Sequence, residues 1–189
     1  MWKCTLPANA KDYVVEVLDA FPEVAAEILI GKEIYVPKFN KILENKMVME
    51  RVNCITCTME DVPDNWIKVL FTLDHDLIPE VAEFIESRNF EGVSFVESCG
   101  CYYEMLPQGV SKGTAIKVML ELTNNENMKI VAVGDYNNDI EMIKMADIGA
   151  CVSSSPDEVK EIADVVLKNT SENNAITELI KYIENNLEV

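Results

Sequence analysis

The chain contains the sequence Lys129-Ile-Val-Ala-Val-Gly-Asp-Tyr-Asn-Asn-Asp139, an apolar run that ends at Gly134 and is followed by two carboxylates, Asp135 and Asp139. The apolar run predicts a buried strand that opens into a ligand-facing turn and a helix. Acidic side chains at the end of a buried strand are costly to desolvate, which favours a bound cation such as Mg²⁺. The structural alternative is that Asp135 caps the next helix and Asp139 is solvated one turn later.

From Ser111 onward, the sequence alternates between helical segments and short apolar strands. The expected helices are 112–122, 140–145, 156–162 and 175–183, and the expected strands are 130–133, 148–152 and 165–167. Repeated strand–helix units with nearly continuous apolar strands favour a parallel sheet that is covered by helices on both faces.

Residues 1–104 follow a different pattern. Apolar spacing up to Phe21 predicts a helix that Pro22 ends, and segments 24–30 and 33–36 predict a hairpin around Gly31. Further helices are expected at 38–49 and 78–88, and further strands at 52–58, 67–73, 92–97 and 102–106. We therefore predict two domains, 1–104 and 105–189, with the boundary near Met105-Leu-Pro-Gln-Gly109.

Four ordered motifs resemble a known family. They are Glu104–Gly113, Val133–Asp139, Met145–Ala150 and Asp157–Val166. Together they are similar to the carboxyl-terminal half of the haloacid dehalogenase (HAD) superfamily, and more narrowly to its Cof-type sugar-phosphate phosphatases. The resemblance implies an α/β fold: a partial HAD-like (Rossmannoid) parallel sheet core in 105–189 and an α+β cap domain of class IIB type in 1–104.

The resemblance also assigns roles to individual residues. Lys112 matches the phosphate-binding lysine, and Asn138 matches an amide beside it, so both are expected to be catalytic and to contact the substrate phosphate. Asp135 and Asp139 match the acidic positions that hold Mg²⁺. A lysine offers a point charge for a phosphoryl oxygen, and Mg²⁺ neutralises the charge shared by phosphate and carboxylates. The structural alternative for Lys112 is an exposed lysine in a first helical turn.

The nucleophile of the family has no clear counterpart here. In the family, an aspartate at the end of the first core strand attacks phosphorus, and this strand precedes the cap, whereas this chain opens with what resembles the cap. We therefore expect the chain alone to be inactive and its Mg²⁺ binding to be weak or absent. Asp74-His-Asp76 and Ser98 imitate the missing motifs, but Leu-Ile-Pro follows Asp76 where the family has Gly-Thr.

Two classes of function remain open. The first is a Mg²⁺-dependent phosphatase of small phosphorylated metabolites, with a nucleophile from Asp74 or from another polypeptide. The second is a non-catalytic binding or regulatory remnant, or a truncated reading frame. A flavodoxin-like or receiver-like binding domain is a weaker third, because the first half resembles a cap. Polar side chains at Asn40, Lys41, Lys46 and Arg51 are candidates for substrate contacts.

Charge and hydropathy limit the partners. The 189 residues carry a net charge of −17, which repels nucleic acid and anionic membranes, so we expect neither as a partner. We find no membrane-length apolar run and no signal-peptide core at Met1-Trp-Lys, and expect a cytoplasmic protein. Without the nucleophile strand, segment 130–133 would be an apolar sheet edge, which favours a homodimer or completion by an amino-terminal segment.

Six cysteines include the pairs Cys54/Cys57 and Cys99/Cys101, whose spacing could be read as a four-thiolate zinc site. The alternative is that they are unpaired thiols in apolar strands of a reducing compartment. No histidine accompanies either pair, which favours the second interpretation.

Overall fold

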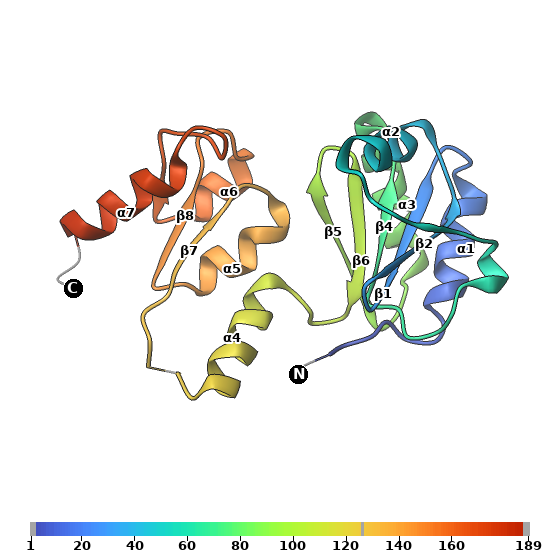
Figure 1. The fold of residues 1–189 in the computed structure, drawn as a ribbon, viewed down its shortest axis with the longest axis horizontal. Helices are drawn as coiled ribbons and strands as arrows, with labels where there is room; N and C mark the ends of the chain where they lie inside the picture. Colours follow the sequence, from blue (N-terminus) through green and yellow to red (C-terminus); the bar gives the residue numbers. More distant parts are fainter. Residues whose placement is uncertain (1–2, 126, 187–189) are drawn as a thin grey trace. The chain divides into compact units, whose positions relative to one another are not determined.

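The computed structural model describes residues 3–125 and 127–186, which fall into two compact units, Met1–Val110 and Ser111–Val189 (Figure 1). The division follows the last strand of the first unit, whereas the sequence analysis placed it between residues 104 and 105. The difference has a local cause, because the strand β6 (Tyr102–Pro107) pairs along its length with β5 (Val93–Cys99) and so belongs wholly to the first unit.

The first unit is built on a six-stranded sheet with the strand order β3-β2-β1-β4-β6-β5. Its other strands are β1 (Ala25–Ile30), β2 (Glu33–Lys38), β3 (Ile55–Thr56) and β4 (Lys68–Thr72). Neighbouring strands run antiparallel except β2 and β3, which are parallel. Its helices are α1 (Ala10–Ala20), α2 (Lys41–Glu50), α3 (Ile78–Arg88) and the short 3-10 turns η1 (Met59–Asp61) and η2 (His75–Leu77).

Alternation along β1 explains the layers of this unit. Ala26 and Ile28 point into the main core, where they join buried residues of α1 and α3. Ala25 lies on the opposite face and packs with Val36 and with Leu43 of α2. Because successive side chains of a strand point to opposite faces, one strand serves both cores.

The second unit has a three-stranded parallel sheet with the order β7-β8-β9. The strands are β7 (Val131–Gly134), β8 (Ile148–Cys151) and β9 (Val165–Val166), and the helical segments are α4 (Lys112–Thr123), η3 (Asn137–Asp139), α5 (Ile140–Met145), α6 (Asp157–Ile162) and α7 (Ala175–Asn186). Ala150 of β8 packs toward α7, and Cys151 packs toward α5 and α6. Helices thus cover both faces, as predicted for a parallel sheet.

Glycine determines how closely α5 lies against this sheet. A Cβ added to Gly149 of β8 would lie 2.3 Å from the backbone oxygen of Ile143 in α5. Real Cβ atoms do not approach backbone this closely, so the contact requires glycine.

The predicted strand 52–58 is the largest local difference from the sequence analysis, since only Ile55–Thr56 is strand and both residues are exposed. The predicted helix 38–49 begins later, at Lys41, because the side chain of Asn40 caps it by accepting the Leu43 N–H at 2.9 Å. Within 3–125 and 127–186, we find no helix of the length and apolar character that crossing a bilayer requires.

Candidate active site

The predicted site residues of the second unit come from the start of α4, the turn after β7 and the 3-10 turn η3. Lys112 is the first residue of α4, whose amino end is capped by a reciprocal pair of hydrogen bonds between Ser111 and Thr114. Asp135 follows the last residue of β7 and is exposed, whereas Asp139 ends η3 and is 3% exposed. The two carboxylates, alike in sequence, therefore differ in environment.

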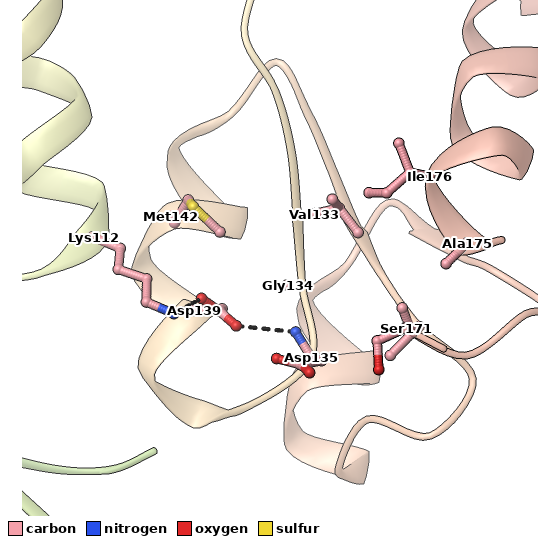
Figure 2. Close-up of a pocket in the computed structure, with 10 residues that line it drawn as sticks. Lys112, Val133, Gly134, Asp135, Asp139, Met142, Ser171, Ala175 and Ile176 are labelled. Carbon is pink, nitrogen blue, oxygen red and sulfur yellow. Dashed lines mark hydrogen bonds and ion pairs between the residues drawn. The ribbon is translucent and has the colours of Figure 1, made fainter. Parts of the chain in front are cut away.

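Asp139 connects the turn after β7 to α4. Its Oδ2 accepts the backbone N–H of Asp135 at 3.0 Å and that of Tyr136 at 3.3 Å. Its Oδ1 forms an ion pair with Lys112, and Figure 2 shows the chain of contacts from this lysine through Asp139 to the amide of Asp135. Lys112 also donates to Oδ1 of Asn138 at 3.3 Å. The predicted set of four residues is thus brought together.

Gly134 allows this arrangement. A Cβ added to it would lie 2.3 Å from the Cβ of Asp139 and 2.8 Å from its Oδ2. Any side chain at this position would displace the carboxylate from the two amides that it accepts. Gly134, which precedes Asp135 in the sequence, is therefore needed for the close approach of Asp139.

A hollow of about 420 Å³ lies next to these groups. Its lining is Lys112, Val133, Gly134, Asp135, Asp139, Met142, Val152, Ser171, Ala175 and Ile176. In Figure 2, the carboxylates and the ammonium lie together, and Val133, Ala175 and Ile176 lie on another side. The site therefore offers a cation and a carboxylate beside an apolar wall.

The donor set fits Mg²⁺ in part. Asp135 presents an exposed carboxylate, a hard oxygen ligand of the kind that Mg²⁺ prefers. A metal at Asp139 would compete with the lysine and the two amides that already occupy its oxygens. In the part of the chain that the structure describes, no three His, Cys, Asp or Glu residues gather into a possible metal site. Asp135 alone would provide one protein ligand, and the prediction that Asp139 is a second one stays untested.

Within residues 3–125 and 127–186, no three cysteines gather into a possible metal site, and the zinc interpretation stays untested. All six cysteines are free thiols.

Asp74, the alternative nucleophile, does not follow a strand of a parallel sheet. It follows β4, which pairs antiparallel with β1 and β6, and its carboxylate accepts the N–H of Asp76 at 3.1 Å as the cap of η2. Three of the polar residues considered for substrate contacts are also engaged locally. Asn40 caps α2, Lys41 pairs with Glu44 at 3.2 Å, and Lys46 pairs with the buried Glu27 at 3.0 Å.

Sequence reasoning missed two polar residues of the site region. Ser171 lines the hollow from the segment before α7, a position that no motif marks. The amide oxygen of Asn137 is buried and has no hydrogen-bond partner among the described residues. Asn137 stands next to Asn138 in the sequence, so its different environment could not be read from residue type.

Comparison with known proteins decides the family. The family model of haloacid dehalogenase-like hydrolases matches residues 1–180. The chain belongs to this family. The resemblance and the HAD-like α/β fold class that the sequence predicted are therefore confirmed, while the assignment of 1–104 as a cap domain stays a prediction.

Individual relatives of this HAD-like hydrolase are similar over part of their length. Phosphoglycolate phosphatase 2 from Saccharolobus solfataricus is 37% identical over 82 residues, which cover 43% of the chain and 35% of that enzyme. A HAD/Cof-like hydrolase from Plasmodium vivax superposes with a TM-score of 0.83 at 19% identity, covering 96% of the chain and 66% of that structure. The HAD subclass IIB sugar phosphatase BT4131 gives 0.78 at 18% identity, covering 97% and 68%. The chain thus spans about a third of the archaeal enzyme and about two thirds of the solved structures.

Proposed function

We propose that this chain provides the phosphate-binding lysine and one Mg²⁺ ligand of a HAD-family phosphatase for small phosphorylated metabolites. The observation that carries the proposal is the placement of the Lys112 ammonium, held by Asp139, beside the exposed carboxylate of Asp135. A fixed cation next to a hard oxygen ligand suits a phosphoryl group that shares a metal with the protein. Two of the relatives named above are described as a phosphoglycolate phosphatase and a sugar phosphatase.

Each residue would have a distinct task in phosphoryl transfer. Lys112 would contact a phosphoryl oxygen, and the amide of Asn138, which accepts from Lys112, would lie beside it. Asp135 would hold Mg²⁺, which when bound neutralises charge on the phosphoryl group. Asp139 would act as a positioning residue, because it fixes both the lysine and the backbone of Asp135.

We further propose that the attacking carboxylate comes from outside the 189 residues. The described lining of the hollow has two carboxylates, Asp135 and Asp139. We assign one to the metal, and the other is buried against Lys112. A covalent aspartyl intermediate needs a third, unengaged carboxylate. The chain alone would then bind phosphate and Mg²⁺ weakly and would not turn over a phosphomonoester.

The first test measures binding by the purified chain. In a ¹H–¹⁵N NMR titration, Mg²⁺ should shift the amides of residues 134–136 at millimolar concentration, and inorganic phosphate should shift those around Lys112 and Asn138. Asp135→Asn should abolish the Mg²⁺ response and keep the fold, because this carboxylate is exposed. Lys112→Met should abolish the phosphate response, because the neutral side chain keeps the apolar stem without the charge.

Lys117, an exposed lysine of α4, provides the matched control. Lys117→Met should leave both titrations unchanged, and a loss of phosphate response in this variant would point to nonspecific attraction. Hydrolysis of p-nitrophenyl phosphate is measured in parallel. Mg²⁺-dependent turnover by the chain alone, absent in Asp135→Asn, would overturn the external nucleophile and make Asp74→Asn the next variant.

The edge of the second sheet indicates how a further segment could be added. In the described sheet, β7 pairs with β8 alone, so its other edge has no strand beside it. Large apolar residues of the same unit are exposed, among them Met119, Leu122 and Met128. A second hollow of about 420 Å³ includes Met119, Met128 and Val131 in its lining. We propose that this edge pairs with an amino-terminal segment of the family's core or with a second copy of the chain.

Light scattering at increasing protein concentration tests this proposal. We expect the purified chain to dimerise or to aggregate, since an apolar edge without a partner invites pairing. Val131→Lys, which places a charge on the edge strand, should reduce this association. A stable monomer at all concentrations, with native-like circular dichroism, would contradict the proposal.

A further inference from the structure

The two thiols at the end of the β5–β6 hairpin lie in contact. Cys99 is the last residue of β5, Gly100 and Cys101 form the turn, and Tyr102 begins β6. The two Sγ atoms are 3.5 Å apart. Among the described residues this is the one pair of cysteines whose thiols are in contact.

The surroundings hold this turn in place. The backbone N–H of Leu73 donates to the carbonyl of Cys101 at 3.1 Å. The ring of Tyr102 lies under the ammonium of Lys46, 4.3 Å from the ring centroid, and Lys46 itself pairs with the buried Glu27. The residues on both sides of the second thiol are therefore held by neighbouring elements.

Burial keeps the first thiol protonated. Desolvation, together with the hydrogen bond and charge of Cys101, raises the pKa of Cys99 to about 11. A disulfide is a strong oxidant when the protein stabilises the thiolate of its reduced form, whereas this site destabilises that thiolate. Oxidation of Cys99 therefore does not remove a thiolate that the protein stabilises.

We propose that Cys99 and Cys101 form a redox-active dithiol that low-molecular-weight disulfides convert to an intramolecular disulfide. One cysteine thiolate attacks a sulfur of the small disulfide, which gives a mixed disulfide and releases one small thiol. The second cysteine then attacks the protein sulfur of the mixed disulfide and releases the other small thiol. The protein loses two protons and two electrons, and the small disulfide gains both.

The geometry favours the second step, so the mixed disulfide should not accumulate. The sulfur atoms must approach from 3.5 Å to a bond length of about 2 Å, which is a short movement. A ring closed across one residue is strained, and strained disulfides have more oxidising potentials than structural ones. The bond should therefore be reduced again by excess thiol, which makes the site reversible.

The test uses the full chain with oxidised glutathione under nitrogen, followed by intact mass and peptide mapping. We expect the parent chain to lose two hydrogens and to yield a Cys99–Cys101 crosslink that reduced glutathione reverses. Cys99→Ser should instead accumulate on the order of tenfold more glutathione adduct at Cys101, because no neighbouring thiol resolves it. The rate should rise with pH, because a thiolate is the attacking group.

Cys54 and Cys57 serve as the internal control, since two residues separate them and, in the part of the chain that the structure describes, their thiols are not in contact. Cys54→Ser should leave the crosslink unchanged. Crosslinking of Cys54 to Cys57 at the same rate, a stable adduct on the parent chain, or no reaction at the hairpin would each overturn the proposal. Fluorescence of Trp66, which lies in the core of the same unit, verifies that each variant is folded.

Discussion

Gly149→Ala is expected to lower the free energy of unfolding of the second unit by about 3 kcal/mol, at the upper end of the usual range for overpacking. The added Cβ would lie 2.3 Å from the backbone oxygen of Ile143 and 2.6 Å from its Cγ2. The first of these atoms belongs to the backbone of α5, so no change of rotamer relieves the contact. Either α5 moves away from β8 or the sheet shifts.

Two spectroscopic signals separate the units in this experiment. Both tryptophans of the sequence precede residue 111, and Trp66 lies in the core of the first unit. Urea unfolding followed by tryptophan fluorescence should therefore be unchanged in Gly149→Ala, whereas circular dichroism should lose part of its amplitude at lower urea concentration.

Gly31→Ala is the control for the backbone cost of alanine alone. Gly31 has a φ of +63° and no atom within 4 Å of an added Cβ. Gly31→Ala should lower the free energy of unfolding by about 1 kcal/mol, the usual cost of a left-handed conformation without glycine. An equal or larger effect of Gly31→Ala would contradict the assigned role of the close contact at Gly149.

Asp139→Ala is expected to destabilise the second unit by about 3 kcal/mol, because hydrogen bonds to charged groups contribute about 1.5–3 kcal/mol each and are not additive. The carboxylate accepts from two backbone amides and pairs with Lys112. Alanine would leave the amides of Asp135 and Tyr136 without this acceptor. Thermal unfolding followed by circular dichroism measures the change.

Asp135→Ala is the matched control, since it removes a carboxylate four residues away that is exposed. Its stability should change by less than about 0.5 kcal/mol, as for most surface substitutions. If Asp135→Ala destabilised as much as Asp139→Ala, the distinction between a metal ligand and a positioning residue would fail. Asp139→Asn should lie between the two, because the amide keeps one acceptor oxygen.

Much of the fold followed from apolar spacing. The helices α3 and α5 were predicted with the bounds that they have, because both combine apolar periodicity with clear flanking signals. The strand β3 was predicted too long, since its segment has β-forming residues but little burial to select a strand. Local propensity does not report what a segment will pack against.

The sequence predicted which residues form the candidate site, but it did not predict the contacts between them. Lys112, Asp135, Asn138 and Asp139 were chosen by motif, and all four lie close together. Their separate tasks depend on burial and on a contact between residues 27 positions apart, which no local pattern contains. Ser171 was missed because no sequence motif marks it, and only the folding of the chain brings it to the hollow.

Three glycines from three elements lie against the segment from Asp139 to Ile143, in which Gly134 of β7 approaches the side chain of Asp139 and Gly149 of β8 approaches Ile143 of α5. Besides Gly149 and Gly134, an added Cβ on Gly113 of α4 would lie 2.8 Å from the backbone oxygen of Glu141. Helix α5 is too short to be stable by itself, so its position depends on these neighbours. In a library of all single substitutions, we would therefore expect variants at all three glycines to be depleted together. Three positions that are far apart in the sequence would then depend on the placement of one short helix and the residue before it.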